Sequence, residues 1–87
     1  MSDELKSRLT RYLQKADQKF STITITADPE KATLLIDSAR RYLHDAHHFE
    51  ETGDPISALA ALEYAEGWVD AARALDLISC EHTGELE

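Results

Sequence analysis

The sequence has little cysteine and no long hydrophobic run. Its single cysteine, Cys80, excludes an intramolecular disulfide and is typical of a reducing compartment. The apolar stretches are far shorter than the ~20 residues that span a bilayer, and the start, Met1 to Glu4, lacks the basic and apolar regions of a signal peptide. We therefore expect a cytoplasmic protein that has no membrane partner.

Basic residues are also scarce. Nine lysines and arginines stand against 17 aspartates and glutamates, which gives a net charge of −8. Such a chain is repelled by the phosphates of nucleic acids, so we expect no nucleic-acid partner. With 87 residues, the chain makes one domain with a single core and little room for an enclosed active-site cleft.

Apolar residues recur at intervals of three and four along three segments, which predicts an all-α three-helix bundle. The first stripe continues from Leu5 to Ile23, so we expect a helix that reaches about Thr24 and then frays. Residues 21–26 also have strand propensity, but the sequence offers no second strand for them to pair with. We predict a domain over residues 1–78 and, because the end is polar and aperiodic, a flexible C-terminal tail over residues 79–87.

Two Asp-Pro pairs predict where the second and third helices begin. Asp28-Pro29 and Asp54-Pro55 each combine an N-cap acceptor with proline at the first helical position. Gly53 provides a left-handed end for the second helix. A junction as short as Gly53-Asp54-Pro55 makes these two helices an antiparallel hairpin.

The third predicted helix, from Pro55 to about Leu75, has an unusually narrow polar strip. Small residues on its back would let another helix approach closely. We infer that this helix is either flanked by both other helices or partly buried in a protein–protein contact. The candidate interface residues are Ala60, Tyr64, Gly67, Trp68, Ala71 and Ala74.

Charges are segregated along the chain. The basic face of the first helix consists of Arg8, Arg11, Lys15 and Lys19. Between Arg41 and Arg73 there are seven carboxylates and no lysine or arginine. This separation could steer a partner or align a symmetric self-contact. Alternatively, the two faces neutralise each other within the bundle.

Histidines and carboxylates are the only candidates for chemistry. His44 and His48 share a helical face, with Glu51 one turn further, a spacing that zinc ligands also use. No fourth ligand is apparent, and the helical wheel places both histidines opposite the core, so we expect them to be exposed and to bind no metal. A carboxylate site of Asp45, Glu66 and Asp70 would need a pocket that shifts one pKa against another. We expect these three carboxylates to be solvated or helix-bonded, and we predict a protein without cofactor or enzymatic activity.

Three aromatic residues are expected to come together. On a hairpin that turns at Gly53, Tyr42 lies level with Ala65, which brings it close to Tyr64 and Trp68. Core packing is the favoured interpretation. A partly exposed Tyr/Trp patch would instead anchor an interface.

About half of the chain carries an ordered set of residues: Tyr42, Asp45-Ala46, Phe49, Gly53-Asp54, Ala58, Tyr64-Ala65, Gly67-Trp68, Asp70-Ala71 and Leu75. This set gives the chain a resemblance to the archaeal family catalogued as domain of unknown function 357. It implies a small three-helix bundle of archaeal, cytoplasmic origin and no enzyme class. In one departure, Asp76 stands where the family tends to have glycine, so we expect the third helix to extend or fray at its end.

These patterns predict a non-enzymatic protein-interaction module. It would form a homodimer or dock a helical partner through the third helix. The alternative is a small metal- or ligand-binding protein that uses the face of His44, His48 and Glu51 or the Tyr/Trp cluster.

Overall fold

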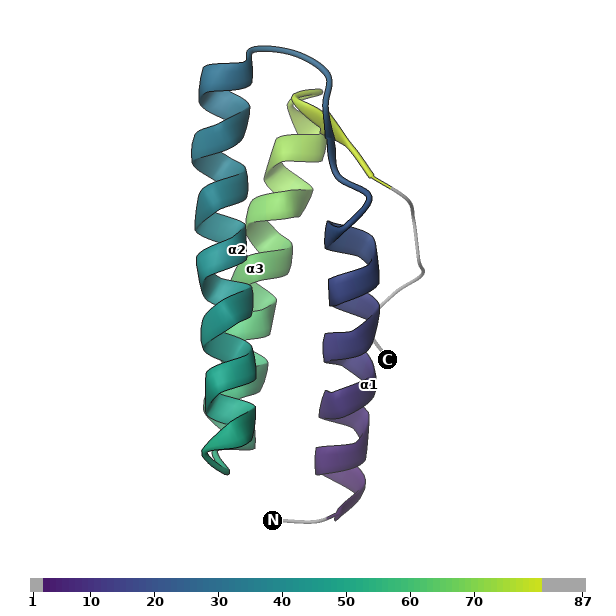
Figure 1. Ribbon diagram of the computed structural model, residues 1–87, viewed down its shortest axis with the longest axis vertical. Coiled ribbons are helices and arrows are strands. Elements are labelled where there is room, and N and C mark those ends of the chain that lie inside the picture. Colours follow the sequence, from purple (N-terminus) through teal and green to yellow (C-terminus); the bar gives the residue numbers. More distant parts are fainter. Residues whose placement is uncertain (1–2, 81–87) are drawn as a thin grey trace.

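The computed structural model describes residues 3–80, which form three helices and two short strands. The helices are α1 (Asp3–Phe20), α2 (Pro29–Glu51) and α3 (Pro55–Ala74), and neighbours in the chain run in opposite directions (Figure 1). The strands are β1 (Thr24–Ile25) and β2 (Ile78–Ser79). The predicted three-helix bundle is confirmed, and it is elongated, with extents of 42 × 21 × 17 Å.

Local sequence signals define where α2 and α3 begin and where the chain turns between them. The side chains of Asp28 and Asp54 accept hydrogen bonds from the backbone N–H groups of Lys31 and Ser57, so both predicted N-caps are present. Each helix begins at the proline that follows its cap. Gly53 has a φ of +82°, the left-handed conformation that glycine adopts without strain. The predicted hairpin is therefore confirmed.

Alanines let α2 and α3 pack closely. Each helix carries three fully buried alanines at intervals of seven residues: Ala32, Ala39 and Ala46 on α2, and Ala58, Ala65 and Ala72 on α3. Side chains this small allow helix axes to approach to the short end of the usual 8–10 Å range. The hairpin is thus a compact unit with one side left for α1.

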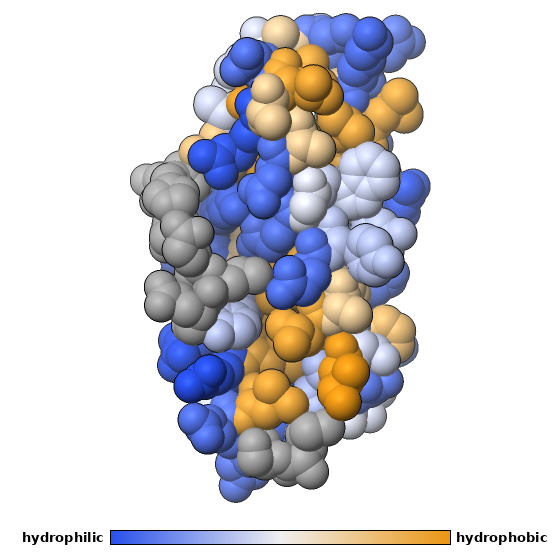
Figure 2. Space-filling model, turned by 180° about the vertical axis from the view of Figure 1, so that it is seen from behind, coloured by the Kyte–Doolittle hydropathy of each residue, from blue (hydrophilic) through white to orange (hydrophobic). Residues whose placement is uncertain are grey.

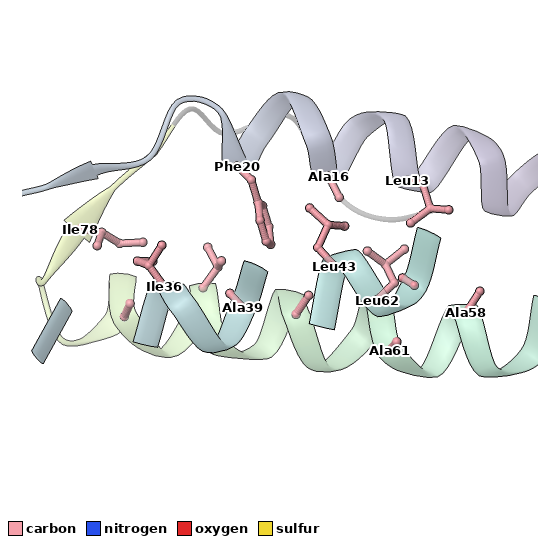
Figure 3. Close-up of a cluster of buried hydrophobic side chains, with 14 of the residues drawn as sticks. Leu13, Ala16, Phe20, Ile36, Ala39, Leu43, Ala58, Ala61, Leu62 and Ile78 are labelled. Carbon is pink, nitrogen blue, oxygen red and sulfur yellow. The ribbon is translucent and has the colours of Figure 1, made fainter. Parts of the chain in front are cut away.

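Larger side chains attach α1 to this hairpin. Figure 3 shows Leu13, Ala16 and Phe20 pointing from α1 toward α2 and α3. Phe20 and Leu13 are only 2 % and 1 % exposed. Burial of such side chains contributes about 1.5–3 kcal/mol each to folding.

The end of α1 differs from the prediction. The helix ends at Phe20 rather than near Thr24, and the chain then forms β1. This strand pairs antiparallel with β2, with Thr24 opposite Ser79 and Ile25 opposite Ile78. The expectation that no second strand was available was wrong, because the pairing residues lie beyond α3.

The end of α3 is also sharper than expected. Asp76 takes a left-handed conformation, with a φ of 60°, and its N–H donates to the carbonyl of Arg73. Leu77 and Ile78 then turn back into the core and are 9 % and 5 % exposed. Aspartate thus performs the helix-ending role of glycine, and α3 does not extend.

Of the predicted C-terminal tail, Ser79 belongs to β2 and Cys80 is partly buried. Residues 81–87 lie outside the described part of the chain. Between residues 3 and 80, no helix is long and apolar enough to cross a membrane.

Candidate functional site

An exposed apolar strip runs along α3 on the side that neither α1 nor α2 covers. We call it the α3 outer strip: Ala60, Tyr64, Gly67, Ala71 and Ala74, with Ile56 and Leu75 at its two ends. The three large side chains, Ile56, Tyr64 and Leu75, are 64 %, 63 % and 65 % exposed. Figure 2 views this side of the molecule and shows hydrophobic and pale residues over α3 among hydrophilic ones. A run of large apolar side chains this exposed is typical of a contact surface.

Aromatic rings form the wall between this strip and α2. Tyr42 and Tyr64 are stacked, with ring centroids 5.2 Å apart and an angle of 23° between the rings. Both rings line an open groove of about 590 Å³, together with Trp68 and with Ala60, Glu63 and Gly67. The predicted approach of Tyr42 and Tyr64 is therefore confirmed, and Trp68 lines the same groove.

The rings combine the two roles that the sequence left open. Tyr42 and Trp68 are partly buried and pack against the core, as expected. Tyr64, in contrast, projects into solvent with more than half of its surface exposed. The cluster is thus a partly exposed aromatic patch, the kind of surface in which interface anchors are found.

Gly67 lies in the middle of the strip and of α3. A Cβ added at this position would meet no described atom within 4 Å, so nothing in the bundle requires a glycine there. Glycine within a helix is nevertheless about 1 kcal/mol less favourable than alanine. The bundle therefore contains a destabilising residue that its own packing does not explain.

The spacing of small residues on the strip repeats that of the α2–α3 contact. Ala60, Gly67 and Ala74 lie at intervals of seven, as Ala58, Ala65 and Ala72 do on the buried side of the same helix. On the buried side, this pattern packs a helix against α3. The outer strip presents an equivalent surface to solvent.

Charged residues border the strip on one side. Glu63 and Asp70 are both exposed and lie seven residues apart on α3. Asp70 has a weak contact with Arg73, at 4.0 Å. On α2, the exposed Asp45 lies one turn from Tyr42. The flank of the strip on α3 is therefore negative, whereas Asp45 on α2 lines the same surface groove as Arg40 and Arg41.

The three carboxylates considered as a site have different surroundings, and the expectation that all three are solvated or helix-bonded is wrong for Glu66. Asp45 and Asp70 are exposed, whereas the carboxylate of Glu66 lies 2.6 Å from the Lys19 ammonium, between α3 and α1. Of the basic residues on α1, Lys19 is thus neutralised within the bundle, as the second interpretation of the segregated charges predicts. The sequence did not indicate this pairing, because Lys19 falls at the border between the polar and apolar sides of α1.

The histidines of α2 separate into two kinds. His44 and His48 are exposed, as the helical wheel predicts, and Glu51 is exposed as well. His47 instead has its Nε2 atom 2.9 Å from a carboxylate oxygen of Asp17, which connects α2 to α1. Within residues 3–80, no three or more His, Cys, Asp or Glu side chains come together in a way that could hold a metal ion.

A second open groove, of about 780 Å³, lies on α2 and shares Tyr42 with the aromatic groove. It is lined by Asp37, Arg40, Arg41, Tyr42, His44 and Asp45. Its lining carries both acidic and basic side chains. All of these residues belong to α2. The aromatic groove differs from it in having a lining that is mainly apolar and aromatic and that comes from two helices.

The fold and the strip define the class of this protein: a small antiparallel three-helix bundle with one uncovered apolar helix face. The chain belongs to the family described as "protein of unknown function (DUF357)", which matches residues 11–78. This range contains the whole α2–α3 hairpin and most of α1, so the resemblance seen in the sequence is confirmed. The chain matches no curated protein and no solved structure.

Proposed function

We propose that this protein is a non-enzymatic interaction module that binds a helix of another chain along the α3 outer strip. The observation that carries the proposal is Gly67. The bundle gains nothing from a glycine at this exposed mid-helix position, because an alanine side chain would fit there without contact. A helix docked on the strip would gain, since its backbone could approach most closely where α3 has no side chain.

Packing inside the molecule supports the same proposal. The α2–α3 contact shows that α3 accepts a neighbouring helix on a row of small residues seven apart. The strip offers a second such row, and Tyr64 beside it supplies a large ring that a partner could cover. Interface energy is often concentrated in tyrosine and tryptophan side chains of this kind.

The alternative of a small-molecule site in the aromatic groove has weaker support. The volume of about 590 Å³ falls in the range of ligand pockets. Such pockets bury most of their ligand, however, and Tyr64 at the groove is 63 % exposed. A long partner that covers the groove and the strip together would bury far more apolar surface.

Site-specific photo-crosslinking in the cells that produce the protein tests the proposal. A photoreactive phenylalanine analogue at position 64 should form a covalent adduct with a protein, and the variant Gly67→Arg should abolish it. The matched control is the same analogue at position 34, because Leu34 on α2 is equally exposed, at 66 %, and lies off the strip. Equal crosslinking at both positions, or an adduct that Gly67→Arg leaves unchanged, would contradict the proposal.

A further inference from the structure

The α3 outer strip has the spacing of a coiled-coil seam. Its residues follow one another at intervals of four, three, four and three: Ala60, Tyr64, Gly67, Ala71 and Ala74. In a coiled coil, the residues on either side of the seam determine which partner is accepted. Here one flank is acidic, with Glu63 and Asp70, and the other is apolar, with Trp68 and Leu75.

A second copy of α3 does not complement these flanks. In an antiparallel two-fold contact, the same flank of each helix meets itself, so Glu63 and Asp70 would face their own copies. In a parallel contact they would face Trp68 and Leu75, which would remove the carboxylates from water without a counter-charge. Both arrangements are electrostatically unfavourable.

A helix with lysine or arginine beside its seam complements the strip. Its cations would pair with Glu63 and Asp70 along the acidic flank. Glu63 lines the aromatic groove together with Tyr42, Tyr64 and Trp68, so a guanidinium or ammonium group there would lie near a carboxylate and near aromatic rings, a setting that suits cation–π contacts. The net charge of −8 would attract such a partner from a distance.

Cations of the chain itself fill this role only in part. Arg73 lies within 4.0 Å of Asp70 on the same helix, and Arg41 on α2 donates a hydrogen bond to the Ser38 hydroxyl. Both remain close to their own helical neighbours. Within residues 3–80, Glu63 has no ion-pair partner within 4.0 Å.

We propose that the occupant of the α3 outer strip is a basic amphipathic helix from a different protein, rather than a second copy of this chain. This inference rests on the proposed function, because it names the partner of the same surface. It assigns a positioning role to Glu63 and Asp70 and a cation-binding role to the aromatic groove.

A charge-swap experiment tests it, with the variant Glu63→Lys/Asp70→Lys of this chain as the basic probe. In antiparallel register, its α3 presents lysines to the carboxylates of the wild-type strip. Wild type and probe should each sediment as monomers at about 100 μM, whereas their mixture should form a 1:1 complex that weakens at least tenfold between 50 and 500 mM salt. The matched control is Asp37→Lys/Glu51→Lys, which changes the net charge equally at exposed positions off the strip and should form no complex.

Three results would overturn the inference, and the proposed function is decided separately by its own test. A wild-type homodimer that Gly67→Arg disrupts would show that a second copy is the occupant, which agrees with the proposed function. Equal binding by the probe and its control would show that charge near the strip selects nothing. The photo-adduct at position 64 provides the second readout: its partner segment should carry lysine or arginine at helical spacing, and a neutral or acidic segment would contradict the inference.

Discussion

The Nζ atom of Lys19 on α1 lies 2.6 Å from Oε1 of Glu66 on α3, and the two side chains are only 10 % and 12 % exposed. The exposed pair Arg8–Glu4 within α1, at 3.5 Å, contrasts with it. A pair shielded from water loses more when one partner is removed, because the remaining charge stays buried without compensation.

Removal of one partner should therefore destabilise the bundle. We expect Glu66→Ala to lower the free energy of unfolding by about 2–4 kcal/mol, and Lys19→Met with Glu66→Leu to fall within about 1 kcal/mol of wild type. Urea titrations in a double-mutant cycle measure the coupling. Glu4→Ala, which breaks the exposed pair, serves as the control, and a loss at Glu66 no larger than that at Glu4 would mean that the pair is screened by water.

Substitutions at Gly67 and Gly53 should change stability in opposite directions. Gly67→Ala should raise the free energy of unfolding by about 1 kcal/mol, because alanine is the better helix former and has room. Gly53→Val should lower it by about 1–2 kcal/mol, because a φ of +82° strains a side chain. Urea or thermal unfolding of both variants checks the pair. Destabilisation by Gly67→Ala would show that the bundle itself needs this glycine, which would remove the main support for helix docking.

The local signals of the sequence were sufficient for the hairpin. Gly53 and Asp54 affect only the backbone conformation and hydrogen bonds of residues next to them in the chain. Their roles can therefore be predicted from residue type alone. The register of that hairpin then brought Tyr42 beside Tyr64. The small residues of the strip could be recognised in the same way, because helical periodicity assigns each residue to a face.

Interactions between distant segments could not be predicted in this way. β1 is only two residues long, and its partner Ile78 lies more than fifty residues further along the chain. A helical pattern that reached Ile23 therefore outweighed the strand propensity. The burial of Lys19 depends likewise on which part of α3 it meets, which periodicity does not specify.

The contact between β1 and β2 should matter more than its length suggests. Ile78 is 5 % exposed and lies opposite Ile25. We expect Ile78→Ala to cost about 2–4 kcal/mol, because it leaves a cavity in the core. Ile56→Ala, at a position 64 % exposed, is the control and should change stability by no more than about 0.5 kcal/mol in the isolated protein. Equal effects in urea unfolding would show that β2 is not part of the folded core.

The cap at Asp54 should make stability depend on pH. Hydrogen bonds from Ser57, its hydroxyl first and its backbone N–H second, lower the pKa of Asp54 below the ordinary value of 3.8. A lowered pKa contributes stability that is fully present above 3.8 and is lost as the pH falls through the folded-state pKa. Asp54→Asn keeps the cap but does not titrate, so it should lose less stability than wild type on acidification below about pH 4. Parallel pH profiles of unfolding in urea would contradict this account.

The exposed histidines should be dispensable for folding. His44→Ala together with His48→Ala should leave the melting temperature nearly unchanged, because both side chains point away from the core. Zinc added to the wild type should not raise it either. A shift of several degrees with zinc, lost in the double variant, would favour the metal-binding alternative.

The short turn at Gly53 has a consequence for the order in which the chain folds. It joins two helices whose contacts are close in sequence, so α2 and α3 can meet after closure of a very small loop. Pairing of β1 with β2, in contrast, must close a loop of more than fifty residues. We therefore expect a transition state in which the α2–α3 hairpin is largely formed while α1 and the strands are not. Substitutions between α2 and α3, such as Ala65→Gly, would then slow refolding, and Ile78→Ala would mainly accelerate unfolding.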